Sequence, residues 1–244
     1  MTHAAENKTD PRPLGDLVPD WTPPPLPGDM VLTGRACIVE PLDAEAHSAQ
    51  LFSAFDGHDW LWDYMPYGPF HSASAYHRWI RDTVANPTMR FYAFRDAASR
   101  KLFGVASYLR MDPAAGSIEV GNICIAPAGQ QSRAFTEAMY LMMRWAFDAG
   151  YRRYEWKCNA LNIPSRRAAQ RLGFSYEGVF RQAVVIKGRN RDTAWFAAID
   201  SEWPALRQAY DSWLSPGNFD DQGRQIERLS DLTRLVRVSS DPAL

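Results

Sequence analysis

The sequence concentrates positive charge in one part of its second half. Residues 151–191 contain ten lysine and arginine side chains and only two acids, Glu155 and Glu177, a local balance of +8, whereas the whole chain of 244 residues has a formal net charge of -1. Clustered cations of this kind bind polyanions such as a phosphorylated cofactor or a nucleic acid, but they also occur on ordinary solvated faces. The charge pattern leaves both interpretations open.

Within this basic segment, Asn162 falls in a turn that follows an expected strand. Ser165 and Arg166 open the expected helix, and Gly173 closes it. An asparagine at such a turn can cap the helix, and it can also bond an amide-bearing ligand. Because a helix N-terminus and nearby arginines attract phosphate groups, the same turn is a candidate anion site.

Several chemistries lack their usual sequence motifs in this chain. No G-x-x-x-x-G-K-[ST], G-x-G-x-x-G, H-E-x-x-H or G-x-S-x-G pattern occurs, which argues against nucleotide hydrolysis, dinucleotide-linked redox chemistry and metalloprotease chemistry. The five histidines all lie in the first third of the chain, which disfavours a Ser-His-Asp arrangement on the later strands. Cys37, Cys124 and Cys158 lack zinc-ligand spacing, so we predict buried reduced thiols and no metal site.

The composition bounds the class of protein. Hydrophobic residues make up 46% of the chain, enough for the core of one large domain. A pI of about 6.5 argues against a generally basic nucleic-acid-binding protein. The sequence contains neither an apolar run of membrane-spanning length nor the pattern of a signal peptide, so we expect no membrane partner and a cytoplasmic location.

The expected elements fall into three parts of the chain. Residues 1–29 hold seven of the 17 prolines and predict a flexible arm, residues 30–214 hold the ordered domain, and residues 215–244 form a polar C-terminal extension. The expected order within the domain is β-α-α-β-β-β-α-β-α-β-β-α, with an alternating strand at 117–125 and a long helix from about 132 to 149. Strands with helices between them predict a single α/β domain with a mixed sheet.

The run from Asn162 to Phe174, N-x-x-S-x-x-A-A-x-R-L-G-F, is followed by E-G-V-F-R at 177–181. Together they resemble the GNAT N-acetyltransferases, and most of all the RimJ/RimL-like branch of ribosomal-protein N-terminal acetyltransferases. Further similar stretches bring the resemblance to about residues 30–214; they lie at 118–122, 136–138, 191–196 and 202–204. The resemblance implies a splayed mixed sheet flanked by helices, acetyl-CoA bound as co-substrate in the splay, and direct acetyl transfer to an amine.

The resemblance also implies which residues would bind acetyl-CoA. Backbone groups of the strand at 117–125 would meet the pantetheine arm, and the loop before the long helix would wrap the pyrophosphate in N–H groups. The cofactor-binding residues expected on this basis are Ile123, Cys124, Ile125, Gln130, Gln131, Ser132, Arg133, Ala134, Phe135, Asn162, Ser165 and Arg166. The family's loop reads Q/R-x-x-G-x-G/A, and Arg133 and Phe135 replace its two small residues here; Arg133 could supply charge in their place, and Phe135 could pack into the core.

An amine nucleophile must lose a proton during acetyl transfer, which favours a nearby base. Glu119 is the candidate, because the resemblance places it beside the thioester and alternation along the strand predicts that it faces the same side as Ile123; a structural carboxylate is the alternative. Ser165 is the candidate acid for the departing thiolate, because the position of the tyrosine that many family members use is Ala169 here; helix capping is the alternative. A covalent intermediate on Cys158 is disfavoured, since direct transfer needs no protein nucleophile.

Aromatic residues before the second expected helix fall where the family forms its acceptor wall. Trp60, Trp62, Tyr64 and Tyr67 are therefore candidate substrate-binding residues, with core packing as the alternative. The leading hypothesis is an acetyl-CoA-dependent N-acetyltransferase acting on the primary amine of a small molecule or of a protein or peptide N-terminus. The alternatives are a non-catalytic acyl-CoA-binding or interaction module on the same fold, and RNA or ribosome binding through residues 151–191, although nucleic acid is not the expected partner. The oligomeric state stays open between monomer and homodimer.

Overall fold

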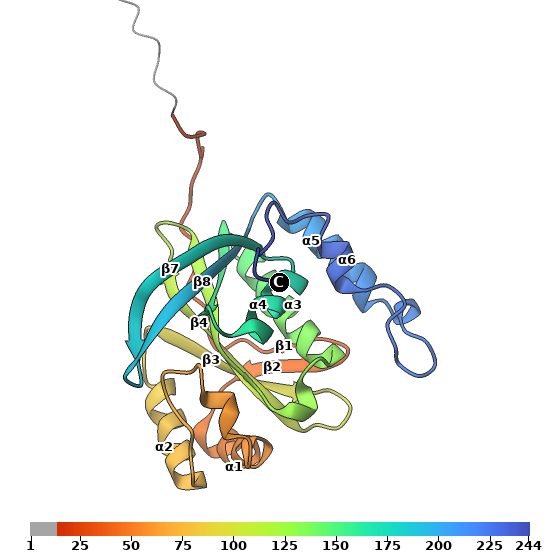
Figure 1. Ribbon diagram of the computed structural model, residues 1–244. Helices are drawn as coiled ribbons and strands as arrows, with labels where there is room; N and C mark the ends of the chain where they lie inside the picture. The colour runs from red at the N-terminus through yellow and green to blue at the C-terminus, as the bar shows by residue number, and fades with distance from the viewer. Residues whose placement is uncertain (1–13) are drawn as a thin grey trace, which may run out of the picture.

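The computed structural model describes residues 14–244, which form one mixed sheet with helices on both faces (Figure 1). The sheet has eight strands in the order β1-β2-β3-β4-β5-β6-β8-β7. The strands are β1 Leu32–Thr33, β2 Cys37–Pro41, β3 Met89–Asp96, β4 Leu102–Asp112, β5 Ser117–Ile125, β6 Arg153–Asn159, β7 Ser175–Ile186 and β8 Arg189–Ile199. The predicted α/β class and mixed sheet are confirmed.

Six α-helices and three 3-10 turns accompany the sheet among the described residues. The α-helices are α1 Ala44–Phe55, α2 Ala73–Val84, α3 Arg133–Asp148, α4 Ile163–Arg171, α5 Trp203–Leu214 and α6 Leu229–Thr233. The 3-10 turns are η1 Asp59–Trp62, η2 Pro127–Gly129 and η3 Pro216–Asn218. No helix within residues 14–244 combines the length and apolarity needed to cross a membrane.

Two hydrophobic clusters occupy opposite faces of the sheet. Side chains alternate along a strand, and on β4 Ala106 joins the cluster under α3 and α5 while Val105 joins the cluster under α1 and α2. The α3 cluster is the larger of the two and also takes in α6 through Leu229. Helices α1 and α2 pack against β3 and β4. They leave β6 and β8 uncovered on the same face of the sheet.

The sheet opens between β5 and β6, the one parallel pair of strands among the described residues. Their pairing runs from Ser117 opposite Arg153 to Val120 opposite Trp156 and goes no further, although both strands continue. The free ends, residues 121–125 and 157–159, therefore border a split in the sheet. This split is the splay that the family resemblance implies.

A bulge on β5 corrects one sequence-based expectation. Ser107 of β4 lies opposite Gly121 and Val105 lies opposite Cys124, so β5 carries one extra residue, and Asn122 takes a positive φ of 53°. Asparagine tolerates this left-handed conformation better than most residues. Because the extra residue reverses the alternation, Glu119 faces the α1/α2 side whereas Ile123 packs against the α3 cluster. The prediction that both face one side was wrong.

Residues near both ends of the described chain pack on the domain. Trp21 donates a hydrogen bond to the carbonyl of Ala114, and Tyr151 and Tyr92 donate to the carbonyls of Pro25 and Gly28. The expected N-terminal arm thus contacts the domain over its second half, and residues 1–13 of it lie outside the described chain. At the other end, α6 packs against α4 and α5.

Candidate active site

A groove of about 820 Å³ lies at the split between β5 and β6. Its walls come from six parts of the chain: the free end of β5, Trp156 of β6, the start of α3 with the loop before it, helix α4, the 3-10 turn η1 with Tyr64, and the end of α5 with the segment that follows it. A groove of this size fits a cofactor-sized ligand. Most of the residues expected to bind cofactor meet here, although they are spread over more than forty positions of the sequence.

The β5 wall consists of Ile123, Cys124 and Ile125. The thiol of Cys124 is buried toward the α1/α2 cluster, so this residue offers the groove its backbone rather than its side chain. Gln130 Nε2 donates to the carbonyl oxygen of Ile125 at 3.1 Å and so ties the next loop to the strand. Since β6 has already diverged, the β5 backbone on that side is available to a ligand.

The loop before α3 places its residues in two ways. Gln130, Gln131, Arg133 and Phe135 line the groove. Ser132 instead caps α3: its hydroxyl accepts from the Phe135 N–H at 3.0 Å and donates to the Gly129 carbonyl at 2.7 Å. The methyl group of Ala134 is buried in the main core. Phe135 does both things, because it borders the groove while packing against that core.

Helix α4 begins at the bottom of the groove with Asn162 and Ser165. Asn162 Oδ1 accepts from the Ser165 N–H at 3.1 Å, which caps the helix, and both residues line the groove. Ser165 Oγ accepts from Trp156 Nε1 at 3.1 Å, so the hydroxyl proton of Ser165 can point elsewhere. Capping and ligand contact, which the sequence left as alternatives, are geometrically compatible at this turn.

Arg166 has a different environment from the one the sequence suggested. Its side chain is buried and does not line the groove; Nε and Nη2 bind the two carboxylate oxygens of Asp241 at 2.6 and 2.5 Å. Its Nη1 also donates to the Ala160 carbonyl at 2.8 Å. Arg166 therefore anchors the segment around Asp241 and, contrary to the expectation from the resemblance, does not face the groove.

Three other arginines, Arg133, Arg167 and Arg171, line the groove. Arg171 donates from Nη1 to Thr136 Oγ1 at 3.0 Å, and burial lowers the pKa of its guanidinium below the usual value. Within the described chain no carboxylate lies within 4.0 Å of any of the three. Their charge is therefore available to an anionic ligand. Arg171 is the arginine of the motif at 162–174, but neither it nor Arg167 was among the expected cofactor-binding residues.

Glu119 lies on the face of the sheet that α1 and α2 leave uncovered. The residue itself is only 3% exposed, because neighbouring side chains surround it. Its Oε2 accepts from Arg110 Nη1 at 2.7 Å and from Lys157 Nζ at 3.0 Å. Lys157 also contacts Glu155 at 2.6 Å, and its ammonium group lies 3.8 Å from the centre of the Trp195 ring. Glu119 does not line the groove itself; it stands on the other side of β5, at the last residues that pair with β6.

The charges around Glu119 continue across the sheet. Glu155 accepts from Arg153 at 2.7 Å, and Arg153 also binds both oxygens of Glu177 on β7. Burial would raise the pKa of Glu155, but hydrogen bonds from Lys157 and Arg153 outweigh it and lower that pKa. Alternating charges thus link β4, β5, β6 and β7. We call this set, Arg110, Glu119, Lys157, Glu155, Arg153 and Glu177, the acceptor-face network.

Two groups beside the split bear on the chemistry. Burial raises the pKa of the Cys158 thiol to about 11, so the thiol stays protonated near neutral pH. Arg191 on β8 lies close enough to Glu119 and Cys158 to feel both electrostatically, and its buried Nε has no hydrogen-bond partner among the described residues. Burial lowers the pKa of Arg191. The sequence motif includes Arg191 but gave no reason to place it at the split.

The four aromatic candidates for substrate binding separate into two pairs. Trp60 and Tyr64 line the groove, and Tyr64 donates to the Leu161 carbonyl at 3.3 Å. Tyr67 donates to Asn122 Oδ1 at 3.1 Å, and Trp62 is buried in the α1/α2 cluster. Trp62 and Tyr67 therefore match the core-packing alternative.

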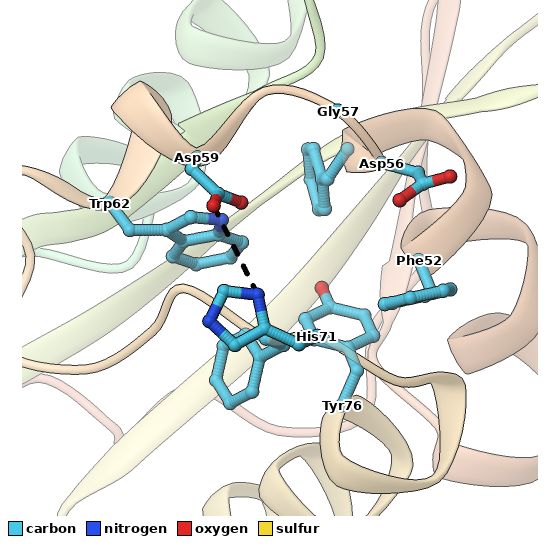
Figure 2. A pocket seen from close by; sticks show the side chains of 9 residues that line it. Phe52, Asp56, Gly57, Asp59, Trp62, His71 and Tyr76 are labelled. Carbon is cyan, nitrogen blue, oxygen red and sulfur yellow. Dashed lines mark ion pairs between the residues drawn. The ribbon is translucent and has the colours of Figure 1, made fainter.

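Trp62 borders a second cavity of about 350 Å³ on the far side of η1 (Figure 2). Figure 2 shows Phe52 and Tyr76 on the other side of this cavity, with Asp59 and His71 at its edge, where Asp59 Oδ2 lies 4.0 Å from His71 Nδ1. The two cavities share no lining residue. The second cavity thus belongs to the α1/α2 cluster rather than to the split in the sheet.

The β7–β8 hairpin curves over toward α2 in Figure 1. Lys187 near its tip donates from Nζ to the carbonyl of Trp62 at 2.8 Å. The hairpin and η1 therefore meet beside the uncovered face that carries Glu119. The domain thus has a split sheet, with a groove lined by unpaired arginines on one side of the split and a charged face on the other.

Comparison with known proteins agrees with this geometry. A model of the acetyltransferase (GNAT) domain matches residues 37–175, and the chain belongs to the GNAT family. A crystal structure of a GCN5-related N-acetyltransferase from Brucella melitensis shares 43% identity with a TM-score of 0.86, covering 89% of this chain and 100% of that one. A probable GNAT acetyltransferase from Chromobacterium violaceum ATCC 12472 shares 40% identity with a TM-score of 0.76, covering 80% and 98%. A search of curated proteins gave no significant match.

The RimL ribosomal L7/L12 α-N-protein acetyltransferase, solved in complex with coenzyme A, has the same fold. It shares 18% identity with this chain at a TM-score of 0.61, covering 70% of this chain and 99% of RimL, a likeness that extends to the fold alone. The RimJ/RimL branch thus remains a prediction. GNAT acetyltransferases use acetyl-CoA, and the groove fits that co-substrate, with free β5 backbone, the N-terminus of α3 and three unpaired guanidinium groups along it.

Proposed function

We propose that this chain transfers the acetyl group of acetyl-CoA directly to the primary amine of a small molecule or of a protein or peptide N-terminus. The observation that carries the proposal is the split between β5 and β6, which borders the groove and begins beyond Val120, the residue after Glu119. A thioester lying in the split would have the β5 backbone on one side. An amine approaching from the uncovered face would meet the thioester next to Glu119.

Each candidate residue has a distinct part in the proposed reaction. The amine nitrogen attacks the thioester carbonyl carbon, and the carbon–sulfur bond breaks as the amide bond forms. Glu119 accepts the proton that the amine loses, directly or through water. Ser165 donates a hydrogen bond to the departing thiolate, which becomes the free thiol when that proton is passed on from Glu119 through water, so the carboxylate is regenerated. Asn162 would hold the pantetheine amide, and Trp60 and Tyr64 would flank the entrance of the acceptor.

The binding module remains the second candidate, and one observation favours it. Both cations next to Glu119 contact its carboxylate within about 3.0 Å, so the group already has partners before any amine arrives. On this view the carboxylate serves the sheet and the groove binds acyl-CoA without turnover.

Thiol release separates the two candidates. The chain is incubated with acetyl-CoA and a panel of small amines and free-N-terminus peptides, and coenzyme A binding is measured by calorimetry in parallel. The proposal expects thiol release that depends on the amine and falls about 100-fold in Glu119→Gln, while coenzyme A affinity stays within about twofold. Tight binding without release across the panel would leave the module as the function, and no binding at all would remove both.

A further inference from the structure

The outer wall of the groove comes from outside the matched family domain. Trp213, Phe219, Gly223 and Gln225 line it, whereas the GNAT family model ends at residue 175. These residues belong to the end of α5 and the loop behind it, beside α3 and α4 on the blue side of Figure 1. We call residues 213–227 the capping segment.

The capping segment is a fixed structure rather than a loose tail. Phe219 and Gln225 form a β-bridge, and Gln225 Oε1 accepts from Trp213 Nε1 at 2.8 Å. The buried Asn218 holds its two ends together, because Nδ2 donates to the Trp213 and Glu227 carbonyls and Oδ1 accepts from the Glu227 N–H at 2.7 Å. The wall it presents to the groove is therefore set before a ligand binds.

Two of the three unpaired arginines lie against aromatic rings of the capping segment. The Arg133 guanidinium lies 3.5 Å from the centre of the Phe219 ring, and that of Arg171 lies 5.2 Å from the Trp213 ring. The two rings meet edge to face at 5.2 Å. Cations held by aromatic rings have no counter-charge of their own, so these guanidinium groups keep their hydrogen-bond donors for an anion.

The position of Arg133 explains why this wall is needed. Arg133 and Phe135 occupy the places where the family pattern has small residues, and the guanidinium group of Arg133, the first residue of α3, lies over Phe219. A phosphate that approaches the N-terminus of α3 would thus meet a guanidinium group backed by the capping segment. The half-buried Phe219 and the amide of Gln225 border the same space and suit a flat heteroaromatic base.

We propose that the capping segment and the three unpaired arginines form a subsite for a phosphorylated purine nucleotide, the adenosine end of the acetyl donor. Phe219 contacts the base, and Arg133, Arg167 and Arg171 bind the phosphates. The inference rests on the proposed use of acetyl-CoA, but it concerns nucleotide binding and makes no demand on the transfer step.

Calorimetry on the full chain tests the subsite with three probes. The probes are coenzyme A, dephospho-coenzyme A, which lacks the 3′-phosphate, and pantetheine, which lacks the nucleotide. Because pantetheine binds more weakly, its binding is measured by NMR chemical-shift changes. Phe219→Ala is expected to weaken both coenzyme A forms about tenfold, the scale of one base–ring contact, and to leave pantetheine unchanged. Arg133→Ala is expected to weaken coenzyme A and to flatten the salt dependence of its binding.

Two controls keep the outcome decisive. Phe219→Trp retains a ring and should recover most of the affinity, and thermal unfolding of each variant shows whether the capping segment is still folded. Unchanged coenzyme A affinity in folded Phe219→Ala, or an equal loss for pantetheine, would overturn the subsite. Coenzyme A binding by the unaltered chain without acetyl transfer would count against the proposed function and leave the subsite standing.

Discussion

The groove and the acceptor-face network differ in whether their charged side chains are paired. In the groove, Arg133, Arg167 and Arg171 lack carboxylate partners within the described chain, and two of them rest on aromatic rings. On the acceptor face, every charge of the network from Arg110 to Glu177 contacts an opposite one. Yet both regions draw cations from the basic segment at 151–191, which supplies Arg167 and Arg171 to the groove and Arg153 and Lys157 to the network.

This difference teaches how to interpret a charge cluster. The local balance of +8 over residues 151–191 divides into cations that the fold neutralises and cations that it leaves for a ligand. Lys157 and Arg166 are buried in ion pairs, and Lys187 bonds a backbone carbonyl. Only the unpaired groups can contribute fully to polyanion binding, which favours a bound phosphorylated ligand over a broad nucleic-acid surface.

The largest expected effect comes from the ion pair that anchors the C-terminal end next to the groove. Arg166→Ala leaves Asp241 buried without its partner, and breaking such a pair costs about 3–5 kcal/mol of the free energy of unfolding. Denaturant unfolding measures the loss. The double variant Arg166→Met with Asp241→Leu is the control, because it removes both charges and should regain much of the stability. A single variant as stable as the wild type would contradict the assigned anchor.

The acceptor-face network should respond in turnover rather than in binding. Glu119→Gln keeps the size of the side chain but removes the proposed base, so kcat is expected to fall about 100-fold. The matched control is Glu155→Gln, which also removes a carboxylate from Lys157 yet leaves Glu119 in place. Equal losses in the two variants would mean that the network matters only as a whole and that Glu119 has no separate role as a base.

Local patterns accounted for what the sequence could predict. The strand expected at 117–125 and the helix expected from about 132 to 149 match β5 Ser117–Ile125 and α3 Arg133–Asp148, because alternation and helix-end signals act over a few residues. The split in the sheet followed from the family resemblance. The motif around Asn162 likewise located the start of α4.

What the sequence missed depends on contacts between distant residues. Arg166 looked like a cofactor ligand because nothing nearby reveals Asp241, 75 positions further on. The bulge at Asn122 reverses the face of Glu119 relative to Ile123, and one extra residue leaves no mark on a simple alternating pattern. The polar tail after residue 215 gave no sign that Phe219 would meet Arg133.

A moderate effect is expected at Asn162, which caps α4 and also lines the groove. Asn162→Ala removes the cap of α4, which costs about 1 kcal/mol of stability, and also removes the proposed contact with the pantetheine amide. Asn162→Asp is the control, since it preserves capping but replaces the amide by a carboxylate. We expect coenzyme A affinity to fall about tenfold in the alanine variant, while kcat at saturating acetyl-CoA changes little. A stability loss with unchanged affinity would make Asn162 a cap alone.

The smallest effect should come from Cys158, which lies between the two regions. Burial raises the pKa of its thiol to about 11, so near neutral pH it is almost wholly protonated and a poor nucleophile. Cys158→Ala is therefore expected to keep kcat within about threefold, with the residual change due to the lost sulfur contacts in the core. A thiol-reactive probe applied at pH 7 to the folded chain gives an independent measurement and should leave Cys158 unmodified. An acetylated Cys158 trapped from acetyl-CoA, together with loss of turnover in the alanine variant, would replace direct transfer by a covalent route. The reacting group would then be a side chain of β6 beside the split, and the split would no longer be only the boundary between the groove and the face that carries Glu119.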